Sequence, residues 1–483
     1  MATLTDQLTR RKPIRVDTGE LGGAGLRRSF GTFQLMMFGV GATVGTGIFF
    51  VLQEAVPDAG PAVIVAFLIA GLGAGLSALC YAEVASAIPV SGSTYSYAYH
   101  ALGELVAVCI AACVLLEYGV SSAAVAVGWS GYFNELLENL VGWHLPDALS
   151  YSPVPYEDNP TGILNLPSVV LVMMCMVLLI RGASESARVN TVMVLIKLSV
   201  LMLFAVIALT AWESDHFSNF WAAGPHGISA AAATIFFSFI GLDAVSTAGE
   251  EVRDPQRALP RAIMGALTVV IAIYVLVAVA GVSAQPTSAF SDPDQQDAGL
   301  SVILTNITGS TVPGTILAAG AVISIFSVTL VTLYGQTRIL FAIGRDGMLP
   351  ERFCSVNPRT LTPTFNTVVV AVVVALIAGF VPADYLWDTV SVGTLIAFTV
   401  VAIGVVVLRR TQPDLPRPFR VPLFPIVPIL TVATCVYVLS GLAAVTWVIF
   451  SAWLLAVVLF YLLWGRRHAA LNRGVVADTE VSP

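Results

Sequence analysis

Twelve long apolar stretches, separated by polar turns, constrain this chain more than any other feature of its sequence. A helix needs roughly 20 apolar residues to cross a hydrocarbon core about 30 Å thick. With 57% hydrophobic and 11% charged residues among 483, the chain needs lipid as its solvent. We therefore predict an all-α polytopic membrane protein with twelve transmembrane helices. They lie near residues 31–54, 60–85, 101–129, 165–182, 189–211, 228–248, 262–283, 312–343, 366–382, 386–408, 424–443 and 447–464.

Positive charges fall on one side of these stretches when the loops are assigned alternately to the two membrane faces. All 23 Lys and Arg residues then share one face, with Lys197 counted with its nearest loop, while the opposite loops carry only acidic charges. Because basic loops stay in the cytoplasm, both termini are expected there, in an inner (plasma) membrane. The net charge of −7 then reflects this sidedness rather than a nucleic-acid partner.

The N-terminal segment argues against a cleavable signal peptide, and the positions of the cysteines argue against disulfides and a metal site. Residues 1–28 are polar and basic, unlike a cleavable signal peptide, so the first apolar stretch is expected to stay in the mature protein. Five of the six cysteines lie within apolar stretches, and Cys354 follows a basic loop. We expect neither a disulfide framework nor a metal site.

A glycine cluster interrupts the first stretch, in the sequence FGVGATVGTGIFF. Four glycines fall within nine residues: Gly39, Gly41, Gly45 and Gly47. Each costs roughly 1 kcal/mol relative to alanine inside a helix. A single pair such as Gly41 and Gly45 would also suit close helix packing, but four glycines with Thr43 and Thr46 exceed that need. We predict an unwound segment that turns a half-helix N-terminus toward the gap, which is a ready carboxylate site.

The sixth stretch carries Gly241 and the acidic Asp243 in an otherwise apolar run. Its break lies five helices after the first, and interruptions in corresponding positions indicate an inverted-repeat transporter with substrate at the midplane. Spacing alone supports this inference, because the halves show no evident sequence similarity. The expected units are a cytoplasmic segment, two five-helix repeats, two peripheral helices and a cytoplasmic tail: residues 1–28, 29–211, 212–410, 411–465 and 466–483.

Lys197 lies inside the apolar stretch 189–211 and is one of only two lysines. Eight residues from the start of a helix, at 1.5 Å each, place it about 12 Å deep. A lysine that snorkels to the interface is one interpretation. We favour the other, in which Lys197 faces the bundle interior and gains and loses a proton during transport.

Glu117, in VLLEYGV, is the second charge expected inside the membrane, and Tyr274 is a candidate hydrogen-bond partner for it. A buried carboxylate should be paired or protonated. A static structural hydrogen bond and a role in proton coupling or gating are both open for Glu117. For Asp243 we favour a supporting role, in which it caps free N–H groups of the broken helix, over direct contact with substrate.

Long motifs in the chain resemble those of the amino acid–polyamine–organocation (APC) superfamily, and within it the cationic amino acid transporter group and its bacterial relatives. The stretches that carry the resemblance are GATVGTGIFF (41–50), FSFIGLDAVSTAGEEVRDPQRALPRAI (237–263), YGQTRILFAIGRDGMLP (334–350) and SVGTLIAFTVVAIGVVVLRRTQPDLPRPFRVP (391–422). The resemblance covers essentially the whole chain. It implies a five-plus-five inverted repeat of the LeuT type, with two peripheral helices, and proton-coupled amino acid uptake without a cofactor.

The resemblance also implies a binding site. In that family, backbone groups of the glycine segment bind the substrate carboxylate, here Thr43, Val44, Gly45, Thr46 and Gly47. Carbonyl groups of the second break receive the substrate ammonium, here Phe237, Ser238 and Ile240. In the proton-coupled relatives a lysine replaces a sodium ion, and Lys197 matches it, as Glu117 matches the family's glutamate.

The substrate stays open between small neutral and cationic L-amino acids, because the family contains carriers of both. Ser327 is expected to face the side-chain end of the pocket, where a small hydroxyl residue leaves room for a longer substrate. Against a cationic substrate, the pocket is expected to hold no acidic residue besides Glu117 and Asp243. Exchange instead of symport, polyamine transport, the oligomeric state and a small accessory membrane subunit are also left open.

Other function classes fit the sequence less well. Neither lysine stands in the Gly-Lys-Ser/Thr context of a P-loop, which excludes ATP hydrolysis by this chain. The five histidines are scattered and no GxSxG turn occurs, which argues against a membrane enzyme. A retinal photoreceptor would also use one intramembrane lysine, but twelve spans and the position of Lys197 argue against it. A sensor that does not transport is left for flux measurements to exclude.

Overall fold

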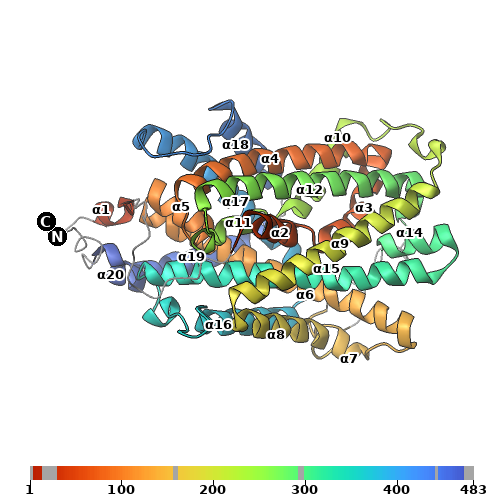
Figure 1. Ribbon diagram of the computed structural model, residues 1–483, viewed down its shortest axis with the longest axis horizontal. Coiled ribbons are helices and arrows are strands. Elements are labelled where there is room, and N and C mark those ends of the chain that lie inside the picture. Colours follow the sequence, from red (N-terminus) through yellow and green to blue (C-terminus); the bar gives the residue numbers. More distant parts are fainter. Residues whose placement is uncertain (1–3, 14–29, 156–160, 292–298, 441–443, 473–483) are drawn as a thin grey trace.

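The computed structural model describes residues 4–13, 30–155, 161–291, 299–440 and 444–472. Its regular structure is helical, and within those ranges the one extended pairing is an isolated parallel bridge between Phe30 and Val252. The long helices run side by side along one axis (Figure 1). This agrees with the all-α fold that the apolar stretches predict.

Seven helices in the described ranges are long and apolar enough to cross a membrane: Val51–Ala87, Glu104–Val141, Arg188–Thr210, Pro255–Ala284, Thr311–Arg345, Val390–Thr411 and Thr446–His468. Four further apolar helices are shorter: Leu166–Arg181, Gly299–Thr308, Thr364–Phe380 and Ile426–Ser440. These lengths and compositions are those of a multi-pass membrane protein. The count of twelve crossings stays a prediction, because several of the expected spans are interrupted or short.

The first half of the chain contains one very long helix. Its elements are α1 (Leu4–Thr9), α2 (Thr32–Thr43), α3 (Thr46–Ala59), α4 (Val63–Ala87), α5 (Ser93–Ala101), α6 (Glu104–Val141), α7 (Asp147–Ser150), α8 (Leu166–Arg181) and α9 (Ala183–Thr210). With 38 residues, α6 is about 57 Å long and extends well past the hydrocarbon core. It ends at Gly142, whose φ of 65° is the left-handed conformation that commonly terminates helices.

The second half contains the other very long helix, α15. The elements are α10 (Gly224–Phe236), α11 (Ala244–Thr247), α12 (Pro255–Ala284), α14 (Gly299–Thr308), α15 (Thr311–Arg345), α16 (Thr364–Phe380), α17 (Ala383–Thr411), α18 (Ile426–Ser440), α19 (Ala444–Phe460) and α20 (Arg466–His468). α15 begins at a capping serine, because the Ser310 hydroxyl accepts a hydrogen bond from the Val312 N–H at 3.3 Å.

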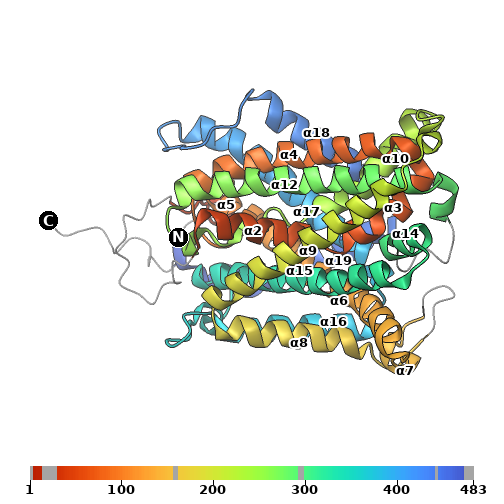
Figure 2. The ribbon, with the colours of Figure 1, turned by 45° about the vertical axis from the view of Figure 1, so that its right-hand side comes forward.

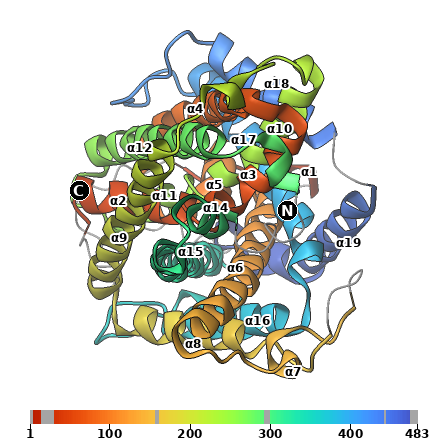
Figure 3. The ribbon, with the colours of Figure 1, turned by 90° about the vertical axis from the view of Figure 1, so that its right-hand side faces the viewer.

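The helices form layers, which are visible when the bundle is turned (Figure 2) and viewed along its length (Figure 3). On one side α4 packs against α12, with α18 outside them, and on the opposite side α8 packs against α16. Between these layers, α15 contacts α6, α9 and α2. The half-helices α2 and α3 lie in this middle layer, so the first interruption is inside the protein rather than at its lipid-facing surface.

Ion pairs join several helix ends at the end of the molecule where α1 and α20 lie (Figure 1). They are Arg10–Glu104, Lys12–Asp346 (2.5 Å), Arg338–Glu251 (2.7 Å), Arg345–Glu250 (2.8 Å) and Arg409–Glu83 (2.5 Å). Burial alone would raise the pKa of the Glu250 carboxyl. The positive charge of Arg345 and the hydrogen bonds from Arg345 and Ser91 outweigh that effect and hold the pKa below its ordinary value. This end of the bundle is therefore held by charge pairs, and it gathers basic residues that the charge pattern assigns to the cytoplasm.

Candidate functional site

The first interruption separates α2 from α3 at Val44 and Gly45, within the glycine cluster that predicts it. Val44 has extended dihedral angles (φ −77°, ψ 90°), and Gly45 follows with φ −131° and ψ −148°. The N-cap residue of α3 is Gly45, which has no side chain to accept hydrogen bonds from the first N–H groups of the helix. The first N–H groups of α3 therefore lack an acceptor within their own helix, and the positive end of its dipole faces the gap.

The second interruption follows α10, as the sequence predicts. The chain passes through a single 3₁₀ turn at Phe237–Phe239 and resumes as the short helix α11 at Ala244. Between them Gly241 has φ +100°, a conformation that residues with a side chain rarely adopt. The backbone of this turn is therefore free of regular helical hydrogen bonding where it meets α2.

Three glycines let the interrupted segments approach one another and α15 closely. A Cβ on Gly241 would lie 2.8 Å from the carbonyl oxygen of Ala42. A Cβ on Gly47 would lie 2.6 Å from Ser238 Oγ, and one on Gly45 would lie 2.7 Å from Val328 Cγ2. These separations are too short for a real Cβ, so a larger residue at Gly241 or Gly47 would push the two breaks apart, and one at Gly45 would displace Val328 of α15.

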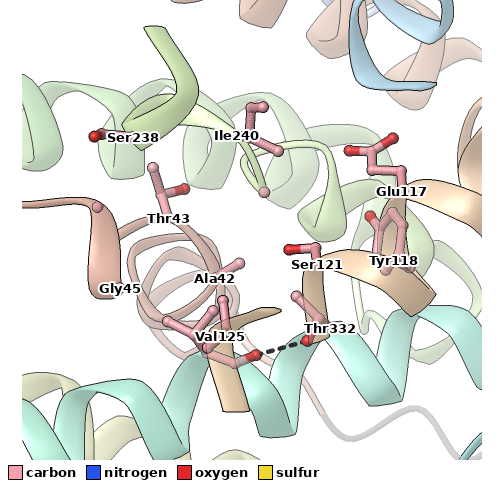
Figure 4. A pocket seen from close by; sticks show the side chains of 13 residues that line it. Ala42, Thr43, Gly45, Glu117, Tyr118, Ser121, Val125, Ser238, Ile240 and Thr332 are labelled. Atoms are coloured by element: carbon pink, nitrogen blue, oxygen red, sulfur yellow. Dashed lines mark hydrogen bonds between the residues drawn. The ribbon is translucent and has the colours of Figure 1, made fainter. Parts of the chain in front are cut away.

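A cavity lies where the two breaks meet α6 and α15 (Figure 4). Its empty volume is about 480 Å³, a figure that includes the open space at its mouth. In Figure 4, Thr43 and Ser238 lie across the open space from Glu117 and Ser121. The residues that line it are Ala42, Thr43, Gly45, Gly47, Glu117, Tyr118, Ser121, Val125, Ser238, Ile240, Gly241, Val328 and Thr332.

Most of the predicted binding residues are brought together here. Thr43, Gly45, Gly47, Ser238 and Ile240 line the cavity. The side chains of Thr46 and Phe237 lie outside the described part of the structure. Val44 is buried and turns its carbonyl toward α9 rather than toward the cavity.

Lys197 is fully buried and binds the C-terminal end of α2. Its ammonium donates to the carbonyl of Gly41 at 3.0 Å and to that of Val44 at 2.6 Å. The Ser324 hydroxyl also donates to the Val44 carbonyl, at 3.3 Å. Because α2 stops at Thr43, the last carbonyls of the helix have no further turn to bind them, and Lys197 supplies the missing donors. The lysine therefore faces the bundle interior and does not snorkel to the interface.

Tyr274 does not contact Glu117, contrary to the expected pairing. Its hydroxyl lies 2.9 Å from the carbonyl oxygen of Thr43 and 2.9 Å from that of Ser238. The tyrosine therefore bridges the two interruptions. The expectation was wrong because the direction of a side chain on a helix that is buried on most faces cannot be read from an apolar sequence.

Glu117 and Asp243 are buried acids close to the cavity. Asp243 stands at the N-cap position of α11, where its carboxyl lies beside the N–H groups of Asp243 itself and Ala244, and it accepts a hydrogen bond from the Tyr118 hydroxyl at 2.6 Å. Glu117 lines the cavity, and its Oε2 has no hydrogen-bond partner among the described residues. Glu117 thus brings a carboxyl group to the lining of the cavity, on the same helix as Ser121.

Ser327 lies away from the cavity, although we expected it at the side-chain end of the pocket. Its hydroxyl is fully buried and donates to the Asn190 side chain at 2.7 Å. The next residue of α15, Val328, lines the cavity together with Thr332. These two residues, with Tyr118, Ser121 and Val125 of α6, were missed because small and hydroxyl residues are common in membrane helices and give no distinct signal.

Comparisons with known proteins support one family over nearly the whole chain. The family model described as "Amino acid permease" matches residues 30–462. The chain belongs to the amino acid permease family. It is a member of the APC superfamily, related to the cationic amino acid transporters.

Relatives of this permease are named for different substrates. It is 39% identical to a methylthioribose transporter of Bacillus subtilis, over 96% of this chain and 99% of the relative. It is 40% identical to a branched-chain amino acid permease of the same organism, over 94% and 96% of the two chains. A vacuolar cationic amino acid transporter of Arabidopsis thaliana is 35% identical, over 85% of this chain and 68% of the relative.

The cavity of this permease offers complementary groups at its two ends. N–H groups at the start of α3 suit an anionic group such as a carboxylate. The carbonyl oxygens of Thr43 and Ser238, which Tyr274 bridges, and the carboxyl group of Glu117 suit a group that donates hydrogen bonds. Among the described residues no cluster of three or more His, Cys, Asp or Glu could hold a metal ion.

Replacing Tyr274 with phenylalanine is expected to destabilise the empty permease more than the substrate-bound one. The change leaves the carbonyls of Thr43 and Ser238 without their shared donor, and an unsatisfied buried acceptor costs about 1–3 kcal/mol. Thermal unfolding in detergent, with and without substrate, measures the difference. Tyr437→Phe, which removes an exposed hydroxyl contact between α18 and Ser229 of α10, is the control. An equal loss in both states of the Tyr274 variant would contradict the bridging role.

Proposed function

We propose that this permease is a secondary active transporter that moves L-amino acids across the membrane by proton-coupled symport with alternating access. The observation that carries the proposal is the cavity between the two interrupted helices, which the N-terminus of α3 and residues of the second break line together. A zwitterionic amino acid has the two charges that match these groups. Its carboxylate would bind the N–H groups of α3, and its ammonium the carbonyls of the second break.

Proton coupling is assigned to Lys197. The Lys197 Nζ lies within hydrogen-bond distance of the carbonyls of Gly41 and Val44, and in its protonated form it would hold both. Loss of the proton weakens these charge-assisted hydrogen bonds, so the end of α2 can move and release substrate inward. The driving force is the proton gradient, and no cofactor takes part.

The membrane arrangement proposed here has twelve spans with both termini in the cytoplasm of a plasma membrane. Two five-helix repeats, residues 29–211 and 212–410, would be related by inverted topology, with the last two helices peripheral. The similar positions of the two breaks and the ion pairs at the end where α1 and α20 lie support this arrangement. Cysteine labelling of the loops from each side of the membrane tests it.

Two substrate classes within the amino acids are supported by different observations. The Glu117 carboxyl group in the cavity lining favours a substrate with an extra donor, such as a cationic side chain. Val125 and Val328 on the cavity wall favour a small neutral side chain. Amino acid exchange and polyamine transport by the same fold are the alternatives.

A neutral polyhydroxyl substrate is the second candidate. Hydroxyl and carboxyl groups of Thr43, Glu117, Ser121 and Thr332 line the cavity, and such groups can bind sugar hydroxyls. One relative, 39% identical over nearly its whole length, is named as a methylthioribose transporter. The candidate is distinguished from an amino acid by its lack of a carboxylate for α3.

Uptake into proteoliposomes tests both proposals in one experiment. Each of the twenty amino acids and methylthioribose is offered with and without an inward proton gradient. Accumulation of one or more amino acids only with the gradient is the expected result. Accumulation that requires internal amino acid instead of a gradient would identify an exchanger. Uptake of methylthioribose alone would replace the amino acid proposal with the second candidate.

A further inference from the structure

Asn190 binds the half-helix α2 at a second point, away from the cavity. It lies seven residues before Lys197 on α9, which places the two side chains on nearly the same helix face, about 10 Å apart along the axis. Both are buried, and both donate to carbonyl oxygens of α2. Asn190 Nδ2 donates to the carbonyl of Met37 at 3.3 Å. α9 therefore holds α2 at two levels.

Each of these two α9 residues works with a serine of α15. The Ser327 hydroxyl donates to Asn190 Oδ1 at 2.7 Å, which fixes the amide with its nitrogen toward Met37. Three residues earlier, Ser324 donates to the Val44 carbonyl that Lys197 also binds. α2 thus lies against α9 and α15 (Figure 2). One contact is made by Lys197 together with Ser324, and the other by Asn190 together with Ser327.

Gly41 allows the amide of Asn190 to reach α2. A Cβ on this glycine would lie 2.7 Å from Asn190 Oδ1 and 2.8 Å from its Nδ2. The Met37 carbonyl is inside the helix, where it also accepts the regular bond from four residues ahead, and its second lone pair is free for the amide. This contact therefore adds to a complete helix turn instead of repairing a helix end.

The two attachments differ in the one property that matters for proton coupling. The Lys197 ammonium can lose its proton, whereas the Asn190 amide keeps its N–H donors because it does not titrate. The elements packed against Lys197 bring no charged side chain to it within the described residues. α2 presents its carbonyls, α15 presents Ser324, and α12 presents Tyr274, whose hydroxyl lies on the Thr43 carbonyl.

We propose that Asn190 is a positioning residue that, with Ser327, pins the middle of α2 to α9 and α15 in every protonation state. Only the end of α2 then follows the proton on Lys197, because the amide contact serves as its fixed point. This inference rests on the proposed proton-coupled function and extends it to a residue outside the cavity. Without the fixed point, the carbonyls of Gly41 and Val44 no longer meet Lys197 in one defined geometry.

The Asn190→Ala variant, reconstituted in proteoliposomes, tests this role. We expect its maximal uptake rate to fall about tenfold, as for loss of one buried hydrogen bond, and the midpoint of its pH profile to shift by at least about 0.5 unit. Its affinity for substrate should change less than about threefold, because Asn190 does not line the cavity. Ser327→Ala should shift the profile in the same direction by less, and it serves if the first variant does not fold.

Two further variants sharpen the test. Asn190→Leu keeps a branched side chain of similar size but removes both the amide donor to Met37 and the acceptor for Ser327, so it should behave like Asn190→Ala. Ser199→Ala is the matched control, because this exposed serine of α9 donates only to Leu195 of its own helix. It should keep the wild-type rate and pH profile.

The outcomes separate this inference from the proposed function. A variant with reduced rate and stability but a pH profile that superimposes on the wild type would reduce Asn190 to ordinary packing and overturn the proposal. If the wild type itself shows no pH dependence, proton coupling fails. Exchange of labelled substrate, measured as a maximal rate and an affinity, then still tests the role of Asn190. An exchange rate of Asn190→Ala equal to that of the wild type would overturn the positioning role.

Discussion

The Lys197→Ala variant is expected to lose proton-driven accumulation of substrate while it still folds and reaches the membrane. Its two acceptors, the carbonyls of Gly41 and Val44, would be left with Ser324 as their one remaining side-chain donor. Each buried charge-assisted hydrogen bond is worth about 1.5–3 kcal/mol, so the end of α2 would lose its defined position. Accumulation with an inward proton gradient should fall to the level seen without one.

Two other lysine variants serve as controls for this experiment. Lys197→Arg keeps a positive charge that is not lost at any accessible pH, so substrate binding should persist while transport stops. Lys12→Ala changes the other lysine of the chain, which pairs with Asp346 at the end of the molecule. It should retain gradient-driven uptake. Full pH-dependent accumulation by Lys197→Ala would remove Lys197 from the mechanism.

The Gly241→Ala variant is expected to abolish both substrate binding and uptake. Alanine at φ +100° costs about 1–2 kcal/mol. Its Cβ would also lie 2.8 Å from the Ala42 carbonyl oxygen and 3.1 Å from the carbonyl carbon. These are backbone atoms that cannot rotate away, and overpacking of this kind costs about 1–3 kcal/mol more. The two interruptions must therefore separate, which opens the site that they form together.

Gly131→Ala is the matched control for this change. Gly131 is an exposed glycine inside α6, and a Cβ there meets no atom within 4 Å. Alanine at this position should preserve uptake and stabilise the helix by up to about 1 kcal/mol. Uptake assays and thermal unfolding of both variants measure the contrast. Wild-type uptake by Gly241→Ala would show that the close approach of the two breaks is dispensable.

The sequence predicted the parts of the site that depend on backbone chemistry. Glycines concentrated in an apolar span predicted the break before α3, because helix formation is weakest there and no other use explains four of them. Lys197 could be placed inside the bundle because its depth exceeded what its side chain can span. Both inferences need only a residue's type and its position along one helix.

The parts that depend on which way a side chain points could not be predicted. Tyr274 and Ser327 lie on helices that are buried on several sides, so apolar periodicity does not tell which neighbour each one faces. Asn190 was missed because an amide near the start of a span resembles an interfacial residue. Its spacing of seven from Lys197 was the available signal. The number of membrane crossings also stays a prediction, because the length of a helix does not show whether an interrupted or short segment crosses the membrane.

The glycines at the two breaks also determine where this protein can vary. Every other amino acid carries at least a Cβ, so replacements at Gly45 or Gly241 bring atoms into space already held by Val328 or by the Ala42 backbone. Substitutions on the α6 and α15 walls, at positions such as Ser121, Val125 and Thr332, are expected to change the cavity without this clash. A change of side chain can therefore reshape the α6 and α15 walls, whereas the walls made by the two breaks contribute peptide groups that every residue carries.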